Sequence, residues 1–223
     1  MKILIAITTA ENVYHETMES IYNLKRTPEM EITLKIIHSY DVANGRNKLV
    51  QIARSLSMDY IFFVDSDIIL PPNALIDLIK HDLPIVNGIY VRKELASITS
   101  DNPWTTLYRH DPQNMNKYNF GPFWMSQDEL PEEGLVAVDA AGLGCTLIKM
   151  SVFDILGGDD DWFVFAKEES KIELGPYCIG EDLYFYRNCL RHDIQPYAES
   201  SVRCGHIGKL IFTLKDKQNV SRS

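Results

Sequence analysis

The sequence contains no hydrophobic run long enough to cross a membrane. Near its start, Lys2 is followed by the short apolar stretch 3–7, which is shorter than the apolar segment of a signal peptide. No other stretch approaches the ~18 apolar residues that a membrane-spanning helix needs. We therefore expect a protein without a transmembrane segment.

Cysteine and basic residues are also scarce. The four cysteines show no Cys-x-x-Cys spacing, so free thiols in a reducing compartment are the simplest interpretation and we expect a cytoplasmic location. The chain has 22 Lys and Arg against 31 Asp and Glu, a net charge of −9. Because a general nucleic-acid binder needs a basic surface, we expect no general nucleic-acid binding.

The composition that remains is that of one α/β domain. The chain has 223 residues, 45% of them hydrophobic and 24% charged, which is ordinary for a globular domain with a sizeable core. Strand-like and helix-like segments alternate along its first half, at 1–7, 17–24, 31–38, 46–56, 60–67, 73–80 and 83–92. This alternation predicts a Rossmann-like domain over residues 1–223, with a mixed, mostly parallel central sheet flanked by helices.

Two helix starts carry specific predictions. Asn44-Gly45 indicates a turn, so we expect Arg46 to begin the second helix. A basic residue at a helix start is unfavourable to the helix dipole; Arg46 is therefore either a surface residue or a contact to a phosphate or base. Asn73 is expected to cap the helix that ends near Lys80.

The most informative stretch runs from Tyr60 to Asp67, where five apolar or aromatic residues lead into two carboxylates. Residues two apart on a strand point the same way, so Asp65 and Asp67 are expected to project together. Open α/β sheets bind ligands at the carboxyl ends of their strands. Two adjacent carboxylates repel unless a cation lies between them, and a divalent metal that carries phosphate groups prefers such oxygen ligands.

Three further motifs follow in the second half of the chain. Gly142 lies in a small-residue loop that lets the backbone approach a ligand closely. Glu181 and Asp182 occupy the first turn of a helix-like segment, where the dipole stabilises negative charge and keeps a carboxylate ionised. His206 lies between two glycines after a strand-like segment. Taken one at a time, each motif also has a structural explanation. Gly142 could belong to a bulged strand, Glu181 and Asp182 could only stabilise the helix, and His206 could be a structural histidine.

In order along residues 1–210, Asp65-Ser66-Asp67, Gly180-Glu181-Asp182 and Gly205-His206-Ile207-Gly208 resemble the motifs of family 2-like glycosyltransferases with the GT-A fold, whose signature is Asp-x-Asp. The resemblance implies a Mn²⁺ or Mg²⁺ ion held by Asp67 and His206. It places Asp65 on the metal, on metal-bound water or on the donor ribose.

The same resemblance implies a nucleotide-sugar donor, a UDP- or GDP-sugar. Residues implied at the donor are Thr8, Thr9, Arg46, Asp65, Ser66, Asp67 and Gly142. Asp182 is implied as the general base that takes a proton from an acceptor hydroxyl, with Glu181 binding the acceptor or assisting. The expected reaction is inverting hexosyl or pentosyl transfer to a glycan, lipid, protein or modified nucleobase; a retaining enzyme would share these motifs.

Residues 94–136 interrupt the alternation of strands and helices and have no clear period. They contain six aromatic residues: Trp104, Tyr108, Tyr118, Phe120, Phe123 and Trp124. Disordered segments are poor in aromatics, so we expect a partly ordered acceptor-side insertion or, alternatively, a satellite core cluster. Residues 209–223 are expected to form a polar C-terminal tail.

Two other functional classes fit part of the sequence. A phosphohydrolase of the haloacid dehalogenase type also has a strand that ends in Asp-x-Asp, with Asp65 as nucleophile and Asp67 as acid and base. That family expects Thr or Val at the position that Ile69 occupies here, and its motif normally lies near the N-terminus. A catalytically silent sugar- or nucleotide-binding module is the second alternative. A sugar-nucleotide pyrophosphorylase fits less well, because its Gly-rich N-terminal loop is absent.

Overall fold

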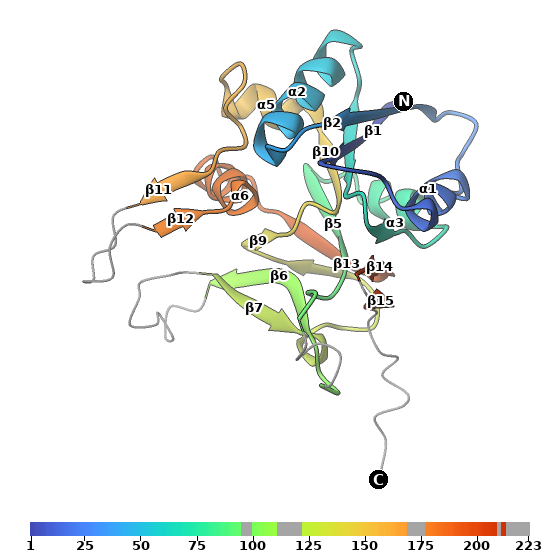
Figure 1. The fold of residues 1–223 in the computed structure, drawn as a ribbon, viewed down its shortest axis with the longest axis vertical. Helices are drawn as coiled ribbons and strands as arrows, with labels where there is room; N and C mark the ends of the chain where they lie inside the picture. Colours follow the sequence, from blue (N-terminus) through green and yellow to red (C-terminus); the bar gives the residue numbers. More distant parts are fainter. Residues whose placement is uncertain (95–99, 111–121, 169–176, 209–210, 213–223) are drawn as a thin grey trace.

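A computed structural model of the chain describes residues 1–94, 100–110, 122–168, 177–208 and 211–212 (Figure 1). The helices are α1 (His15–Tyr22), α2 (Val42–Ser55), α3 (Ala74–Ile79), α5 (Met150–Leu156) and α6 (Glu181–Arg191), with a 3-10 turn η1 (Gln127–Glu129). The central sheet has seven strands, in the spatial order β2 (Glu31–His38), β1 (Lys2–Thr9), β3 (Tyr60–Val64), β10 (Cys145–Lys149), β5 (Ile85–Ile89), β13 (Tyr197–Arg203) and β8 (Leu135–Ala137).

Three smaller sheets accompany the central one. Their strands, in spatial order, are β7 (Pro122–Ser126), β6 (Trp104–His110) and β9 (Ala140–Ala141); β15 (Ile211–Phe212), β14 (Gly205–Ile207) and β4 (Ile68–Ile69); and β11 (Ala166–Glu168) with β12 (Tyr177–Ile179). Since β9 directly precedes β10 in the chain, the first of these sheets joins the central one through a short connection.

The predicted fold class is confirmed. Strands β2, β1, β3, β5 and β13 run in one direction, while β10, between β3 and β5, and β8, at one edge, run the opposite way. The sheet is therefore mixed and mostly parallel. Helices α2, α5 and α6 cover one face and α1 and α3 cover the other (Figure 1), as crossover connections require.

Alternating side chains of the strands build one hydrophobic cluster on each face of the sheet. In β3, Ile61 and Phe63 join the cluster under α2, α5 and α6, whereas Phe62 and Val64 join the one under α1 and α3. All four are almost completely buried. A strand that is buried on both faces reads as a continuous apolar run, which is why the sequence marks β3 so clearly.

The predicted start of α2 was wrong, whereas α3 begins directly after Asn73 as predicted, with Asn73 at the N-cap position. Helix α2 begins at Val42, because Asp41 caps it by accepting a hydrogen bond from the Asn44 amide at 3.1 Å. Gly45 makes no turn; a Cβ there would lie 2.6 Å from a methyl group of Thr8, so the glycine allows α2 to approach β1. Asn73 precedes α3 but makes no capping hydrogen bond with its side chain.

The stretch 94–136 is more regular than the sequence predicts. Its described part contains β6, β7, η1 and β8, and β6 pairs with β7 and β9. Leu107 and Met125 are buried in the main core, whereas Trp104 and Trp124 are 43% and 39% exposed. Tyr118 and Phe120 lie outside the described residues, as does most of the predicted tail 209–223, of which β15 is described.

A buried carboxylate fastens α3 to β13. Glu199, 1% exposed, accepts hydrogen bonds from the amide and hydroxyl of Ser201 at 3.1 and 2.7 Å and from the Gly134 amide at 3.2 Å. Its other oxygen lies 2.5 Å from Nε2 of His81, just beyond α3. Although burial alone would raise the pKa of Glu199, the hydrogen bonds from Ser201, His81 and Gly134 outweigh it and lower the pKa to about 2.

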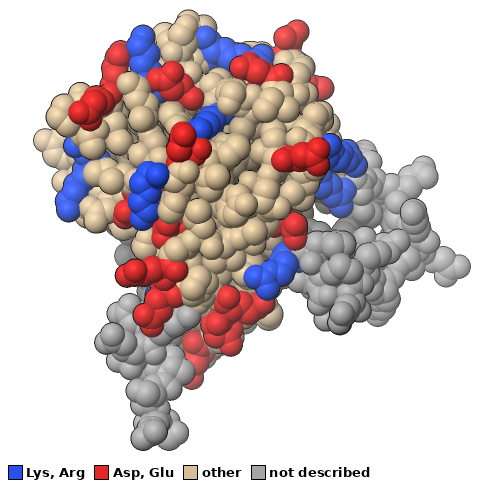
Figure 2. Space-filling view, turned by 180° about the vertical axis from the view of Figure 1, so that it is seen from behind, with Lys and Arg blue, Asp and Glu red and all other residues tan. Residues whose placement is uncertain are grey.

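The described helices agree with one sequence-based expectation. None of the helices in the described ranges is long and apolar enough to span a membrane. Figure 2 shows basic and acidic side chains interspersed over one face, without a continuous basic stripe among the residues drawn in colour.

Candidate functional site

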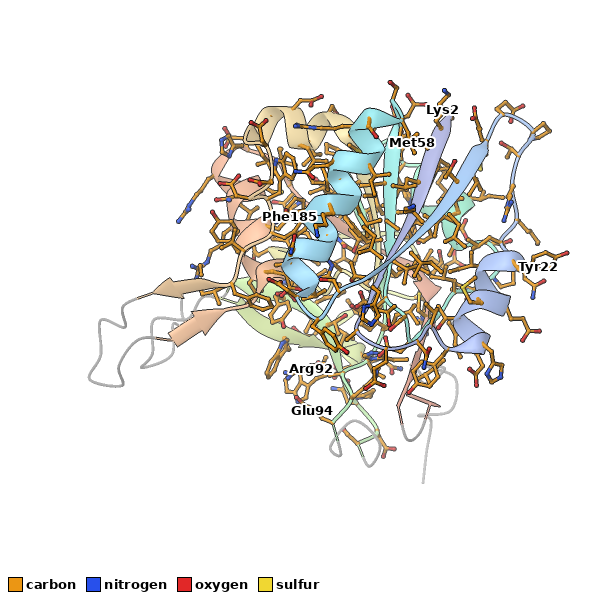
Figure 3. The ribbon with its side chains drawn as sticks, turned by 45° about the horizontal axis from the view of Figure 1, so that its top comes forward. Lys2, Tyr22, Met58, Arg92, Glu94 and Phe185 are labelled. Atoms are coloured by element: carbon orange, nitrogen blue, oxygen red, sulfur yellow. The ribbon has the colours of Figure 1, made fainter. Side chains whose placement is uncertain are left out.

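A cavity of about 330 Å³ opens at the carboxyl ends of β1 and β3. It is lined by Thr8, Thr9, Ala10, Ser39, Tyr40, Val42, Arg46, Asp65, Ser66, Asp67 and Glu181. In Figure 3, Lys2 and Met58, near the amino ends of β1 and β3, lie at the opposite end of the sheet from Arg92 and Glu94. Because its lining residues end β1 and follow β2 and β3, the cavity lies at the edge where open α/β sheets bind ligands.

Most residues predicted from the sequence meet in this cavity. Thr8 and Thr9 end β1, Asp65 to Asp67 follow β3, Arg46 belongs to α2 and Glu181 begins α6. Sequence reasoning missed Ser39 and Tyr40, which follow β2 and line the same cavity. Their position directly after a parallel strand was the available signal.

The two aspartates reach the cavity by a different route from the one predicted. Strand β3 ends at Val64, and a turn closed by the Ile68 amide on the Asp65 carbonyl at 3.2 Å carries both residues. Strand alternation therefore does not align them. Asp65 faces Arg46, and Asp67 faces Lys93 and His206.

Arg46 is the centre of the charged part of the site. Its side chain is 5% exposed, and Nη2 donates to Asp65 Oδ1 at 2.9 Å while Nη1 is paired with Glu181. Burial opposes the charge of Arg46, but Asp65 and Glu181 outweigh it and raise the pKa of the guanidinium. The alternative of a surface arginine was wrong; Arg46 instead joins β3 to the start of α6.

Asp67 and His206 form the candidate metal pair. His206 Nε2 lies 3.7 Å from Asp67 Oδ1, and His206 Nδ1 lies 2.8 Å from the carbonyl oxygen of Val91. Because a carbonyl only accepts, Nδ1 donates to it, and in the neutral ring Nε2 then carries the lone pair and faces Asp67. Burial lowers the pKa of His206 and so favours this neutral, ligand-competent ring.

This pair fits a divalent cation, although the third predicted ligand is engaged elsewhere. Ligand distances of roughly 2.1 Å on each side can span 3.7 Å, and an orienting hydrogen bond to the far nitrogen is typical of metal-bound histidine. Asp65, by contrast, is paired with Arg46. Across the described ranges, no three His, Cys, Asp or Glu side chains gather as a metal-binding group, and a metal on Asp67 and His206 stays a prediction.

Asp182 differs from the sequence-based expectation. The helix dipole was expected to keep its carboxylate ionised, yet burial, followed by the charge of Glu181, raises its pKa to about 6. A hydrogen bond from the Leu183 amide at 2.7 Å and the charge of Arg46 act the other way but do not prevail. Gly180 makes room for this carboxylate, since a Cβ there would lie 2.6 Å from Asp182 Oδ1.

The predicted small-residue loop contacts a protein side chain. A Cβ at Gly142 would lie 2.2 Å from the Tyr90 hydroxyl, which accepts a hydrogen bond from the Gly144 amide at 2.9 Å. Burial raises the pKa of Tyr90 well above its usual range, so the phenol is neutral. Gly142 is absent from the cavity lining; its contact with a donor stays a prediction.

Aromatic side chains of β6 and β7 lie beyond the cavity. The Arg92 guanidinium stacks 3.0 Å from the ring centre of Trp124, and Tyr108 lies 6.0 Å from the same ring. The charge of Asp182 contributes to the raised pKa of Tyr108, after burial, which places this hairpin within electrostatic range of α6.

Fold and site together define a three-layer α/β domain with a charged ligand cavity at the carboxyl edge of its sheet. The fold is shared with the crystal structure of A197 from STIV, with a TM-score of 0.60 and 19% sequence identity over 100% of this chain and 98% of A197. At this identity the likeness shows the fold alone. No protein-family model matches the sequence, and no curated protein sequence matches it.

Proposed function

We propose that this protein is a glycosyltransferase with a single GT-A domain that transfers a sugar from a nucleotide-sugar donor to an acceptor hydroxyl with the aid of Mn²⁺ or Mg²⁺. The observation that carries the proposal is the composition of the cavity. Uncharged groups of Thr8, Thr9, Ser39 and Tyr40 lie in the same cavity as Asp67, whose carboxylate faces His206. A nucleoside suits the first part and a metal-bound diphosphate the second.

The charged residues have separate roles in this proposal. Asp67 and His206 would hold the cation, which when bound supplies charge neutralisation for the departing nucleotide. Arg46 pairs with Asp65 and orients its carboxylate to accept a hydrogen bond from the donor ribose. It also fixes Glu181 and with it the start of α6, where the acceptor would bind.

Asp182 is the proposed general base. A base is most effective when its pKa lies near the working pH, and a pKa of about 6 leaves Asp182 mostly ionised at neutral pH yet able to accept a proton. Attack by the deprotonated hydroxyl from the side opposite to the nucleotide gives inversion. The exposed aromatics Trp104 and Trp124 would offer the acceptor a hydrophobic surface.

The free, buried cysteines Cys145, Cys189 and Cys204 agree with a reducing, cytoplasmic environment, which is part of the proposal. The acceptor would be a glycan, lipid, protein or modified nucleobase that carries a free hydroxyl group.

The test is binding and slow hydrolysis of a panel of UDP- and GDP-sugars with and without Mn²⁺. We expect selective, metal-dependent binding of one donor, and loss of that binding by at least ~10–100-fold in Asp67→Ala. Unchanged Mn²⁺-dependent binding in Asp67→Ala would refute the metal assignment. Binding of nucleotides without any donor hydrolysis or transfer would indicate a silent binding module. Release of inorganic phosphate from phosphate monoesters would indicate a phosphohydrolase.

A further inference from the structure

Lys93 occupies a position in the site that the sequence did not indicate. Its ammonium group is paired with Asp67 Oδ2, while the other oxygen of the same carboxylate faces His206 Nε2. The segment that carries it also builds the site. Val91 orients His206 through its carbonyl, and the Tyr90 ring packs edge-on against the histidine with 5.1 Å between ring centres.

The two aspartates are therefore each paired with one basic side chain, but the two pairs differ in mobility. Arg46 is 5% exposed and held by two carboxylates, so it is fixed. Lys93 is 31% exposed and has a long, flexible side chain with a compact charge. Only Lys93 is free to leave its carboxylate without burying an unpaired charge.

We propose that Lys93 is a phosphate-binding residue that changes partner. In the free protein it pairs with Asp67; when Asp67 binds a divalent cation, Lys93 is released and binds the diphosphate of the donor. This proposal rests on the proposed function, since it assigns a residue to the diphosphate of the same donor site. It makes the binding of metal and of diphosphate mutually dependent.

The physical argument is charge balance at one carboxylate. A single charge cannot compensate both an ammonium group and a divalent cation at contact distance, and the two cations repel. A diphosphate brings the negative charge that the displaced ammonium needs, and lysine binds phosphate as a point charge.

The first measurement is Mn²⁺ binding to the free protein, followed by the electron paramagnetic resonance signal of unbound Mn²⁺. Lys93→Met is expected to bind Mn²⁺ roughly 10-fold more tightly than the wild type, because the competing cation is gone. Lys93→Arg keeps the charge and should bind Mn²⁺ as the wild type does. Lys48→Met, which removes the same charge from an exposed position of α2, is the matched control.

The second measurement is calorimetric binding of inorganic pyrophosphate at saturating Mn²⁺. Lys93→Met should bind pyrophosphate roughly 10-fold more weakly, and Lys93→Arg should restore most of the affinity. If Lys93→Met binds Mn²⁺ no more tightly than the wild type, or binds pyrophosphate with wild-type affinity, the proposal that Lys93 moves from Asp67 to the diphosphate is refuted. Thermal unfolding checks that each variant is folded, and Lys93→Gln, which also removes the charge, replaces Lys93→Met if that variant is misfolded.

These results are independent of those from the donor panel. If the protein binds none of the nucleotide sugars but the Mn²⁺ and pyrophosphate affinities change as described, the proposed donor fails while the role of Lys93 stands. If one donor binds and reacts but Lys93→Met behaves as the wild type does in both measurements, the role of Lys93 fails while the proposed function stands.

Discussion

Glu199 on β13 and Asp182 at the start of α6 are both carboxylates withdrawn from water, yet their pKa values move in opposite directions. Glu199 accepts hydrogen bonds from Ser201 and Gly134 and contacts His81, and its pKa falls to about 2. Among the described residues, Asp182 accepts a hydrogen bond from the adjacent Leu183 amide, and its pKa rises to about 6.

The difference lies in the supply of donors and positive charge around each group. Glu199 is matched by amides, a hydroxyl and an imidazole that fit its two oxygens. In the candidate site, the guanidinium of Arg46 forms ion pairs with Asp65 and Glu181 and interacts with Asp182 only at longer range. A carboxylate whose oxygens are matched by hydrogen-bond donors stabilises the fold. A buried carboxylate with few donors has a raised pKa and remains available for proton transfer.

Replacement of Asp182 by Asn gives the largest expected effect. The shape is kept and the basicity is lost, so transfer should fall by ~10²–10⁴, the range of general-base catalysis. Donor affinity should stay near the wild-type value because the base acts on the acceptor. Single-turnover transfer and donor binding, measured in parallel, check this.

The stability of the same variant tests the comparison itself. A raised pKa means that the ionised carboxylate is less stable in the folded chain than in the unfolded one. Asp182→Asn should therefore leave the free energy of unfolding at neutral pH unchanged or increase it. A clear loss of stability would mean that Asp182 is a structural residue like Glu199.

Replacement of Glu199 by Gln should have the opposite outcome. We expect a loss of about 2–3 kcal/mol in the free energy of unfolding and unchanged donor affinity, measured by denaturant unfolding and calorimetry. Glu133→Gln, at an exposed position nearby, is the matched control.

The pH dependence of this loss has a definite sign. The folded pKa of Glu199, about 2, lies below its ordinary value of 4.5, so its stabilisation is fully present above pH 4.5 and is lost as the pH falls through about 2. The difference between wild type and Glu199→Gln should shrink over that window. A difference that is constant with pH would show that packing, not charge, is responsible.

The sequence predicted the parts of this molecule in which local pattern and global structure agree. Strand β3 is buried on both faces, so its sequence is a continuous apolar run that predicted a central strand. The carboxylates beyond it line the cavity at the carboxyl edge of the sheet, although the turn that carries them was not predicted. The fold class followed from the alternation of strands and helices.

What the sequence did not predict depends on contacts between distant segments. The burial of Arg46 follows from the positions of Asp65 and Glu181, which are 19 and 135 residues away. The raised pKa of Asp182 follows from burial and the neighbouring Glu181 charge, which outweigh the local effect of the helix dipole. Lys93 lies far from the motifs in sequence and meets Asp67 only in the fold.

The smallest expected effect concerns Glu181, whose charge is the second cause of the raised pKa of Asp182. In the wild type, transfer should decline as the pH falls through about 6, because protonated Asp182 is not a base. Glu181→Gln removes one negative neighbour and frees Arg46 to favour the ionised Asp182 more strongly. Both changes lower the pKa, so the acid limb of the pH–rate profile should move to lower pH by up to about one unit, which corresponds to ~1.4 kcal/mol. Transfer at neutral pH should fall much less than in Asp182→Asn.

An acid limb that stays at its wild-type position or moves to higher pH would show that a group other than Asp182 titrates there. If Glu181→Gln is inactive while Asp182→Asn transfers normally, Glu181 is the base.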